Sequence, residues 1–107
     1  MYNLKITKEA TEDIDKIIAY ITNVLKNPIA ADNLLTEFEK SFKDIAYNPK
    51  MYPFCNDIGL KQNGYRKIPV KNYIIFYKQD VEHDIVYIMR VIYGRRDYTK
   101  LIYNIIK

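Results

Sequence analysis

Histidine, cysteine, glycine and tryptophan are scarce in this sequence of 107 residues, which has one histidine, one cysteine, three glycines and no tryptophan. The lone cysteine, Cys55, excludes an internal disulfide. Together with His83 it supplies two ligands, whereas a structural zinc site needs about four nitrogen or sulfur ligands. Three glycines cannot build a glycine-rich phosphate loop, and one histidine gives no basis for a serine–histidine–aspartate triad. We therefore expect no metal and no cofactor.

Long apolar runs are also missing. No apolar stretch approaches the roughly 20 residues that a membrane-spanning helix needs, because Lys, Asp or Asn interrupts each candidate. The first five residues, Met1 to Lys5, lack the basic-then-apolar layout of a signal peptide. A chain of this length is expected to form one domain. We therefore expect a single domain over residues 1–107, located in the cytoplasm and without a membrane partner.

Acidic residues are scarce in the second half of the chain. Residues 1–47 hold six lysines and eight acidic residues, a net charge of −2, whereas residues 48–107 hold eleven basic and five acidic residues, a net charge of +6. Such a split indicates that a polyanion or an acidic partner contacts the second half. The alternative is that the lysines solvate strand edges and prevent aggregation.

Helical periodicity dominates the first half. Apolar residues recur every three or four positions after Thr7, which suits a helix N-cap, and Asp13 falls on the polar, solvent-facing side. Asn27-Pro28 ends this helix, and a second one runs from Pro28 to Asn48-Pro49. The short joint predicts a helical hairpin packed against a flat element. The apolar stripes are Ala10, Ile14, Ile17, Ile18, Ile21, Val24 and Leu25 in the first helix and Ala31, Leu34, Leu35, Phe38, Phe42 and Ile45 in the second.

After residue 63 the apolar period changes to two, which is typical of strands. Residues 50–63 are expected to form an irregular connection. The strands that follow predict an antiparallel meander, and Pro69 indicates that the first of them lies at a sheet edge. Lys71-Asn72 is expected to form a tight turn with the asparagine in the left-handed conformation. The expected strands are Tyr2–Ile6, Tyr65–Val70, Tyr73–Lys78 and Ile85–Tyr93, with a polar loop over Gln79–Asp84.

These elements predict an α+β domain. Its order is an N-terminal strand, a two-helix hairpin, a three-stranded antiparallel meander that completes one sheet, and a short C-terminal helix over Asp97–Ile106. The N-terminal strand can join the sheet either beside the meander or between its strands.

Cationic side chains are the candidates for function. Five basic residues and no acidic residue occur between Lys61 and Gln79, and in a meander such positions can share one surface with interleaved tyrosines. Arginine binds phosphates and tyrosine rings stack on bases, so this surface suits a nucleic acid or an acidic segment of a partner protein. Structural roles are the alternative, because the stem of Arg90 can cover the sheet while its head reaches water. The candidate binding residues are Arg66, Lys67, Lys71, Arg90, Arg95, Arg96 and Tyr98.

Three segments of the second half resemble the RelE/ParE superfamily of toxins from type II toxin–antitoxin systems. They are Tyr65–Val70, Asn72–Tyr77 and Ile88–Asp97, and the order of elements is similar over essentially the whole chain. The resemblance implies a toxin that a cognate antitoxin neutralises. It also implies one of two targets, because RelE-like members cut messenger RNA in the translating ribosome, whereas ParE-like members are described as poisons of DNA gyrase.

The branch decides whether the protein is an enzyme. By their place in the RelE pattern, the candidate catalytic residues are Arg66, Lys67, Arg96 and Tyr103. Ile74, however, occupies the position of another key RelE arginine, and isoleucine cannot bind phosphate. The middle strand and residues 89–97 resemble ParE. We therefore expect a ParE-like toxin that binds gyrase. A ribosome-dependent ribonuclease and a non-toxic module that acts in autoregulation with its antitoxin are the alternatives.

Overall fold

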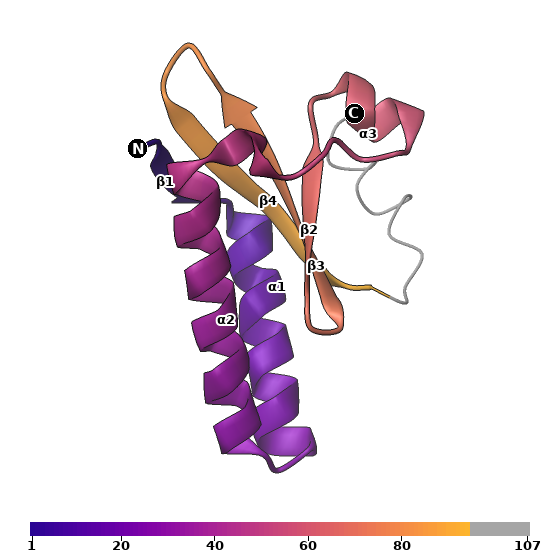
Figure 1. Ribbon diagram of the computed structural model, residues 1–107. Coiled ribbons are helices and arrows are strands. Elements are labelled where there is room, and N and C mark those ends of the chain that lie inside the picture. The colour runs from indigo at the N-terminus through magenta and orange to yellow at the C-terminus, as the bar shows by residue number, and fades with distance from the viewer. Residues whose placement is uncertain (95–107) are drawn as a thin grey trace.

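The computed structural model describes residues 1–94 and has two layers, a pair of long helices and a four-stranded sheet (Figure 1). The expected α+β class is confirmed, whereas the expected helix over Asp97–Ile106 lies outside the described residues. The helical elements are α1 (Lys8–Ala19), a π-helical turn η1 (Tyr20–Val24), α2 (Pro28–Tyr47), a 3-10 turn η2 (Pro49–Met51) and α3 (Ile58–Gln62). The strands are β1 (Asn3–Ile6), β2 (Arg66–Val70), β3 (Tyr73–Asp80) and β4 (Ile85–Tyr93).

Helices α1 and α2, which form the hairpin, each begin at the expected residue. The Thr7 hydroxyl accepts a hydrogen bond of 3.1 Å from the Ala10 N–H, and the Asn27 side chain accepts one of 3.1 Å from the Ala30 N–H. Each cap satisfies a donor that the first helical turn leaves unpaired. Pro28 occupies the first turn of α2, where the missing N–H removes no helical hydrogen bond. Local signals of capping and proline therefore set both starting points.

The sheet has the strand order β1-β4-β3-β2. The three later strands form the expected antiparallel meander, and β1 joins it in parallel beside β4. Strand β2 lies at an edge, as Pro69 predicted, because proline has no N–H to donate to a further strand. The register shifts between β3 and β4, where Phe76 faces Arg90 but Tyr77 faces Ile88. Met89 is therefore the extra residue of a β-bulge.

Two apolar clusters lie on the two faces of the sheet. The face covered by the hairpin, called the helix face below, packs Ile75 and Tyr77 against Phe38 of α2. The opposite face, called the open face, packs Phe76 against Leu60 of α3 in a smaller cluster. Successive side chains of a strand point to opposite sides, so β3 contributes to both clusters. The open-face cluster contains Cys55, Leu60, Tyr65, Phe76 and Ile92.

The first helix departs from the expected pattern at its end. A regular amphipathic helix was predicted through Leu25, but α-helical bonding ends at Ala19 and η1 follows. There the Leu25 N–H donates to the Tyr20 carbonyl at 3.1 Å, a step of five residues. This wider turn shifts the phase of the helix, and Val24 and Leu25 are each more than half exposed. Their predicted place in the apolar stripe is therefore wrong.

Three smaller expectations were also wrong. The connection over residues 50–63 contains α3, whose five residues are too few to show a helical period, and which buries Leu60 completely. Strand β3 continues to Asp80, two residues into the expected loop. In the turn between β2 and β3, Lys71 rather than Asn72 has the positive φ, 56°. The twist of a two-residue hairpin loop requires that conformation at the first loop position, whatever residue stands there.

Candidate functional site

The cations of β2 lie on different faces of the sheet. Arg66 and Lys67 are neighbours, and side chains alternate along a strand. Arg66 is paired with Tyr77, whose side chain belongs to the helix face, and Lys67 is paired with Phe76 of the open face. The expectation that the cations of the meander share one surface is therefore wrong for this pair.

On the helix face, Arg66 makes contacts within the protein. Its Nη1 donates to the Tyr52 carbonyl at 2.6 Å, and its guanidinium carbon stands 3.8 Å from the ring centroid of Phe54. The backbone of Phe54 forms an isolated antiparallel bridge with Arg66. These contacts fasten the segment before α3 to the edge of the sheet. Binding of a target by Arg66 stays a prediction.

Arg90 forms a two-pronged ion pair with Asp13 of α1. Its Nε and Nη2 donate to the two carboxylate oxygens at 2.6 and 2.8 Å, and the Val91 N–H donates to the same carboxylate at 3.0 Å. The side chains of Arg90 and Asp13 are 14% and 15% exposed. Hydrogen bonding to Asp13 raises the pKa of Arg90 above its ordinary value.

Two expectations about this pair are wrong. Asp13 does not face solvent, and the head of Arg90 does not end in water. The bulge at Met89 interrupts the regular alternation of β4, and such an insertion re-aims the neighbouring side chain. The regular alternation of side chains that the sequence suggested for this strand does not predict the changed direction of Arg90.

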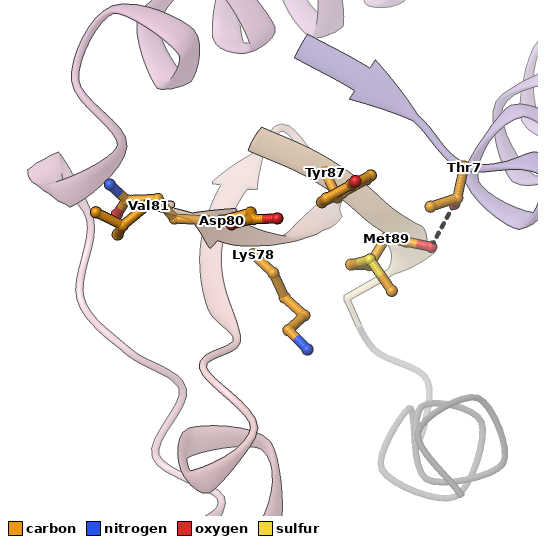
Figure 2. A pocket seen from close by; sticks show the side chains of 7 residues that line it. Thr7, Lys78, Asp80, Val81, Tyr87 and Met89 are labelled. Carbon is orange, nitrogen blue, oxygen red and sulfur yellow. Dashed lines mark hydrogen bonds between the residues drawn. The ribbon is translucent and has the colours of Figure 1, made fainter. Parts of the chain in front are cut away.

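A shallow hollow of about 530 Å³ lies on the open face (Figure 2). The Thr7 hydroxyl bounds it at the end of β1 and donates to the Met89 carbonyl at 3.0 Å. Lys78 supplies a cation, whose Nζ stands 5.2 Å from the ring centroid of Tyr65. The hollow is lined by Thr7, Lys78, Gln79, Asp80, Val81, Tyr87 and Met89.

The hollow combines groups suited to an anionic or planar partner. Lys78 and Tyr87 are paired across β3 and β4, so both side chains belong to the open face, and the ammonium of Lys78 lies over the ring of Tyr65. Asp80 brings the opposite charge to the same rim. Lys78 is one of the five basic residues of the predicted cationic surface between Lys61 and Gln79, although it was not among the predicted binding residues, and its alternation with Phe76 indicates that it lies on the open face.

The centre of the open face is apolar. Ile74 packs against the cluster that contains Phe76 and Ile92. A Cβ added at Gly94 would lie 3.4 Å from the Ile74 Cγ1 atom and 3.3 Å from the Asn72 carbonyl oxygen, so the chain passes close to this side chain. The position at which the resemblance to RelE requires an arginine is thus occupied by a packed aliphatic side chain.

Two buried titratable side chains, one in the cluster on each face of the sheet, keep their protons at neutral pH. Burial raises the pKa of Tyr77 to about 12, and its hydroxyl donates to the Pro49 carbonyl at 2.7 Å. Burial also raises the pKa of the Cys55 thiol. Neither group is suited to proton transfer or nucleophilic attack at neutral pH.

The remaining predicted residues lie either at an exposed turn or outside the described part of the chain. Lys71 lies at the exposed turn between β2 and β3. Within residues 1–94, no group of three or more His, Cys, Asp or Glu side chains could hold a metal ion. Over the same part of the chain, no helix combines the length and apolarity needed to cross a membrane. The predicted site residues Arg95, Arg96, Tyr98 and Tyr103 lie outside the described residues.

Comparison with known families gives a match over nearly the whole chain. A family model described as the ParE toxin of the type II toxin–antitoxin system parDE matches residues 4–98. A search of curated proteins gave no match.

Solved structures of toxins have a similar fold. The chromosomal ParDE system from P. aeruginosa matches at a TM-score of 0.69 and 18% identity, over 87% of this chain and 96% of that one. The toxin–antitoxin complex RelBE2 from Mycobacterium tuberculosis matches at 0.59 and 22% identity, over 86% and 96%. The isolated E. coli RelE toxin matches at 0.61 and 14% identity, over 98% and 99%.

Proposed function

This chain belongs to the family of ParE toxins of type II toxin–antitoxin systems, within the RelE/ParE superfamily, and we propose that it inhibits growth by binding DNA gyrase. We propose further that a cognate antitoxin neutralises it. The similar fold of toxins solved as RelBE2 and ParDE systems supports an antitoxin partner.

The observation that carries the choice of target is the apolar centre of the open face. Catalysis on a phosphodiester requires cations that converge on one phosphate. Ile74 packs into the apolar cluster there, and Arg66 lies on the other side of the sheet, bound to the Tyr52 carbonyl. A surface that holds a macromolecule needs no such convergence. Over residues 1–94, the arrangement therefore favours binding without hydrolysis.

A supercoiling assay tests this proposal. Purified protein in stoichiometric excess over gyrase is expected to reduce the supercoiling of relaxed plasmid. Addition of the cognate antitoxin is expected to restore it, which controls for nonspecific inhibition. Unchanged supercoiling at that excess contradicts the proposal.

A ribosome-dependent ribonuclease is the second candidate. It is favoured by Lys67 and Lys78, which lie on the same open face on neighbouring strands. Toeprinting on translating ribosomes distinguishes it, because a ribonuclease leaves cuts at defined codon positions. Growth that continues after induced expression would instead favour a non-toxic module that acts in autoregulation.

A further inference from the structure

Four large apolar side chains stay in solvent along the chain between α2 and α3. Between 43% and 77% exposed, they are Tyr47, Met51, Phe54 and Ile58. This stretch, residues 47–58, is called the edge segment below, because the backbone of Phe54 forms a bridge with Arg66 at the edge strand β2. Figure 1 shows it crossing from the end of α2 to α3. Apolar side chains gathered on one part of a surface mark an interaction site more often than isolated ones do.

The backbone of the edge segment is fastened to the sheet. The Tyr77 hydroxyl donates to the Pro49 carbonyl at 2.7 Å, and Arg66 donates to the Tyr52 carbonyl at 2.6 Å. The inner side of the segment buries Pro49 and Cys55. The exposed apolar side chains therefore project from a backbone that the rest of the fold holds in place.

The exposed side chains are of the types that occur at the centres of protein–protein interfaces. Methionine, aromatic residues and arginine are enriched there, whereas lysine and acidic residues are depleted. The Arg66 guanidinium carbon stands 3.8 Å from the ring centroid of Phe54, and Phe54 remains 43% exposed. Met51 and Ile58 have no group that binds a phosphate. The edge segment therefore suits a protein partner better than a nucleic acid.

The charges around the edge segment are mainly positive. Residues 48–79 hold six basic residues and one acidic residue, a net charge of +5. The acidic residue, Asp57, caps α3, where its side chain accepts from the Leu60 N–H at 3.1 Å. Lys50 and Lys61 are exposed. A second copy that met this surface with its own would bring like charges together, whereas a partner with acidic groups around apolar ones matches it.

We propose that the edge segment is the surface through which this toxin binds its target protein, DNA gyrase, at a site where acidic side chains surround apolar ones. Met51, Phe54 and Ile58 pack on the apolar part of that site, and Lys50 and Lys61 face its acids. Since the backbone is already held in place, association costs little ordering of the segment. This inference rests on the proposed function, and it names the surface that carries it out.

Matched substitutions test the proposal. Ile58→Asp changes the edge segment, and Ile29→Asp is its control, because both isoleucines are 72% exposed and stand in the first turn of a helix. An acidic residue is favourable in a first turn, so both variants are expected to fold, which circular dichroism checks. Met51→Asp, with the exposed Val81→Asp as control, repeats the comparison at an independent position. We expect the protein concentration that halves gyrase supercoiling to rise at least tenfold for Ile58→Asp and Met51→Asp, and less than twofold for the controls.

Other results would overturn the assignment. Inhibition by the wild type that all four variants retain would remove the edge segment as the contact surface and leave the proposed function intact. Equal weakening by all four variants would mean that the added charge matters and its place does not. Parallel loss of affinity for a duplex DNA fragment, measured by fluorescence anisotropy, would identify DNA as the occupant. Sedimentation that shows a wild-type dimer, dispersed by Ile58→Asp, would identify a second copy. A wild-type protein that leaves supercoiling unchanged would contradict the proposed function itself, and the surface assignment with it.

Discussion

Asp13 and Arg90, 77 positions apart in the chain, join α1 to β4 through both carboxylate oxygens. The same carboxylate accepts the Val91 N–H at 3.0 Å, so it holds the backbone of β4 as well as the guanidinium. The two side chains are mostly withdrawn from water. Loss of one partner therefore leaves a charge and a backbone donor poorly compensated.

We expect Asp13→Asn to lower the free energy of unfolding by about 2–4 kcal/mol, since it breaks a largely buried ion pair. Urea unfolding followed by circular dichroism measures the change. Asp15→Asn, at an exposed position of the same helix, is the control and is expected to change it little. A loss for Asp13→Asn no larger than that of the control would show that the pair contributes no more than a surface ion pair.

We expect Arg66→Ala to lower the free energy of unfolding by about 1–2 kcal/mol, because the Tyr52 carbonyl loses its donor. Hydrogen exchange should quicken at the Cys55 N–H, which donates to the Tyr65 carbonyl beside the loosened segment. Lys50→Ala, at an exposed position, is the control. Unchanged stability together with lost inhibition of gyrase would instead make Arg66 a target-binding residue.

We expect Lys71→Gly to raise the free energy of unfolding by about 0.5–1 kcal/mol. Lys71 has a φ of 56°, which glycine adopts without the clash that a Cβ causes. Asn72→Gly, one position along the same turn, is the control and is expected to give no gain. Thermal unfolding of the two variants against the wild type makes the comparison. Equal effects at both positions would contradict the strain assigned to Lys71.

Tyr77 makes stability depend on pH in the alkaline range. Its pKa is raised from 10 to about 12 by burial, so the folded state keeps a proton that the unfolded chain releases. Stability from this group is complete below pH 10 and is lost as the pH rises toward 12, at up to about 1.4 kcal/mol per pH unit. Tyr77→Phe should give a shallower slope between pH 10 and 12 than the wild type. Tyr47→Phe, at an exposed tyrosine, should keep the wild-type slope.

The helix starts and the edge position of β2 were predictable because their causes are local. The caps at Thr7 and Asn27 and the proline at position 28 act within one helical turn. Pro69 likewise indicated an edge strand from its own missing N–H. Short or displaced features were missed, such as α3 and the end of β3 at Asp80, since a few residues give too little periodicity to detect.

The candidate site was harder to predict than the fold. The chemical type of each site residue follows from the sequence alone. Ile74, for example, cannot bind a phosphate wherever its side chain lies. Which of these residues lie together could not be predicted, because adjacent cations such as Arg66 and Lys67 lie on opposite faces of the sheet. The resemblance to the superfamily, now supported by a family match over residues 4–98, identified the class of protein.

The sequence by itself determined the element order, the α+β class and the basic character of the second half, because periodicity, capping and charge are properties of neighbouring residues. Tertiary structure decided which charges are available to a partner. Arg90 is paired with Asp13 only because a bulge in β4 meets α1. Val24 and Leu25 are exposed where a π turn shifts the phase of the helix before the hairpin closes. Both outcomes depend on contacts and backbone geometry that no local pattern encodes.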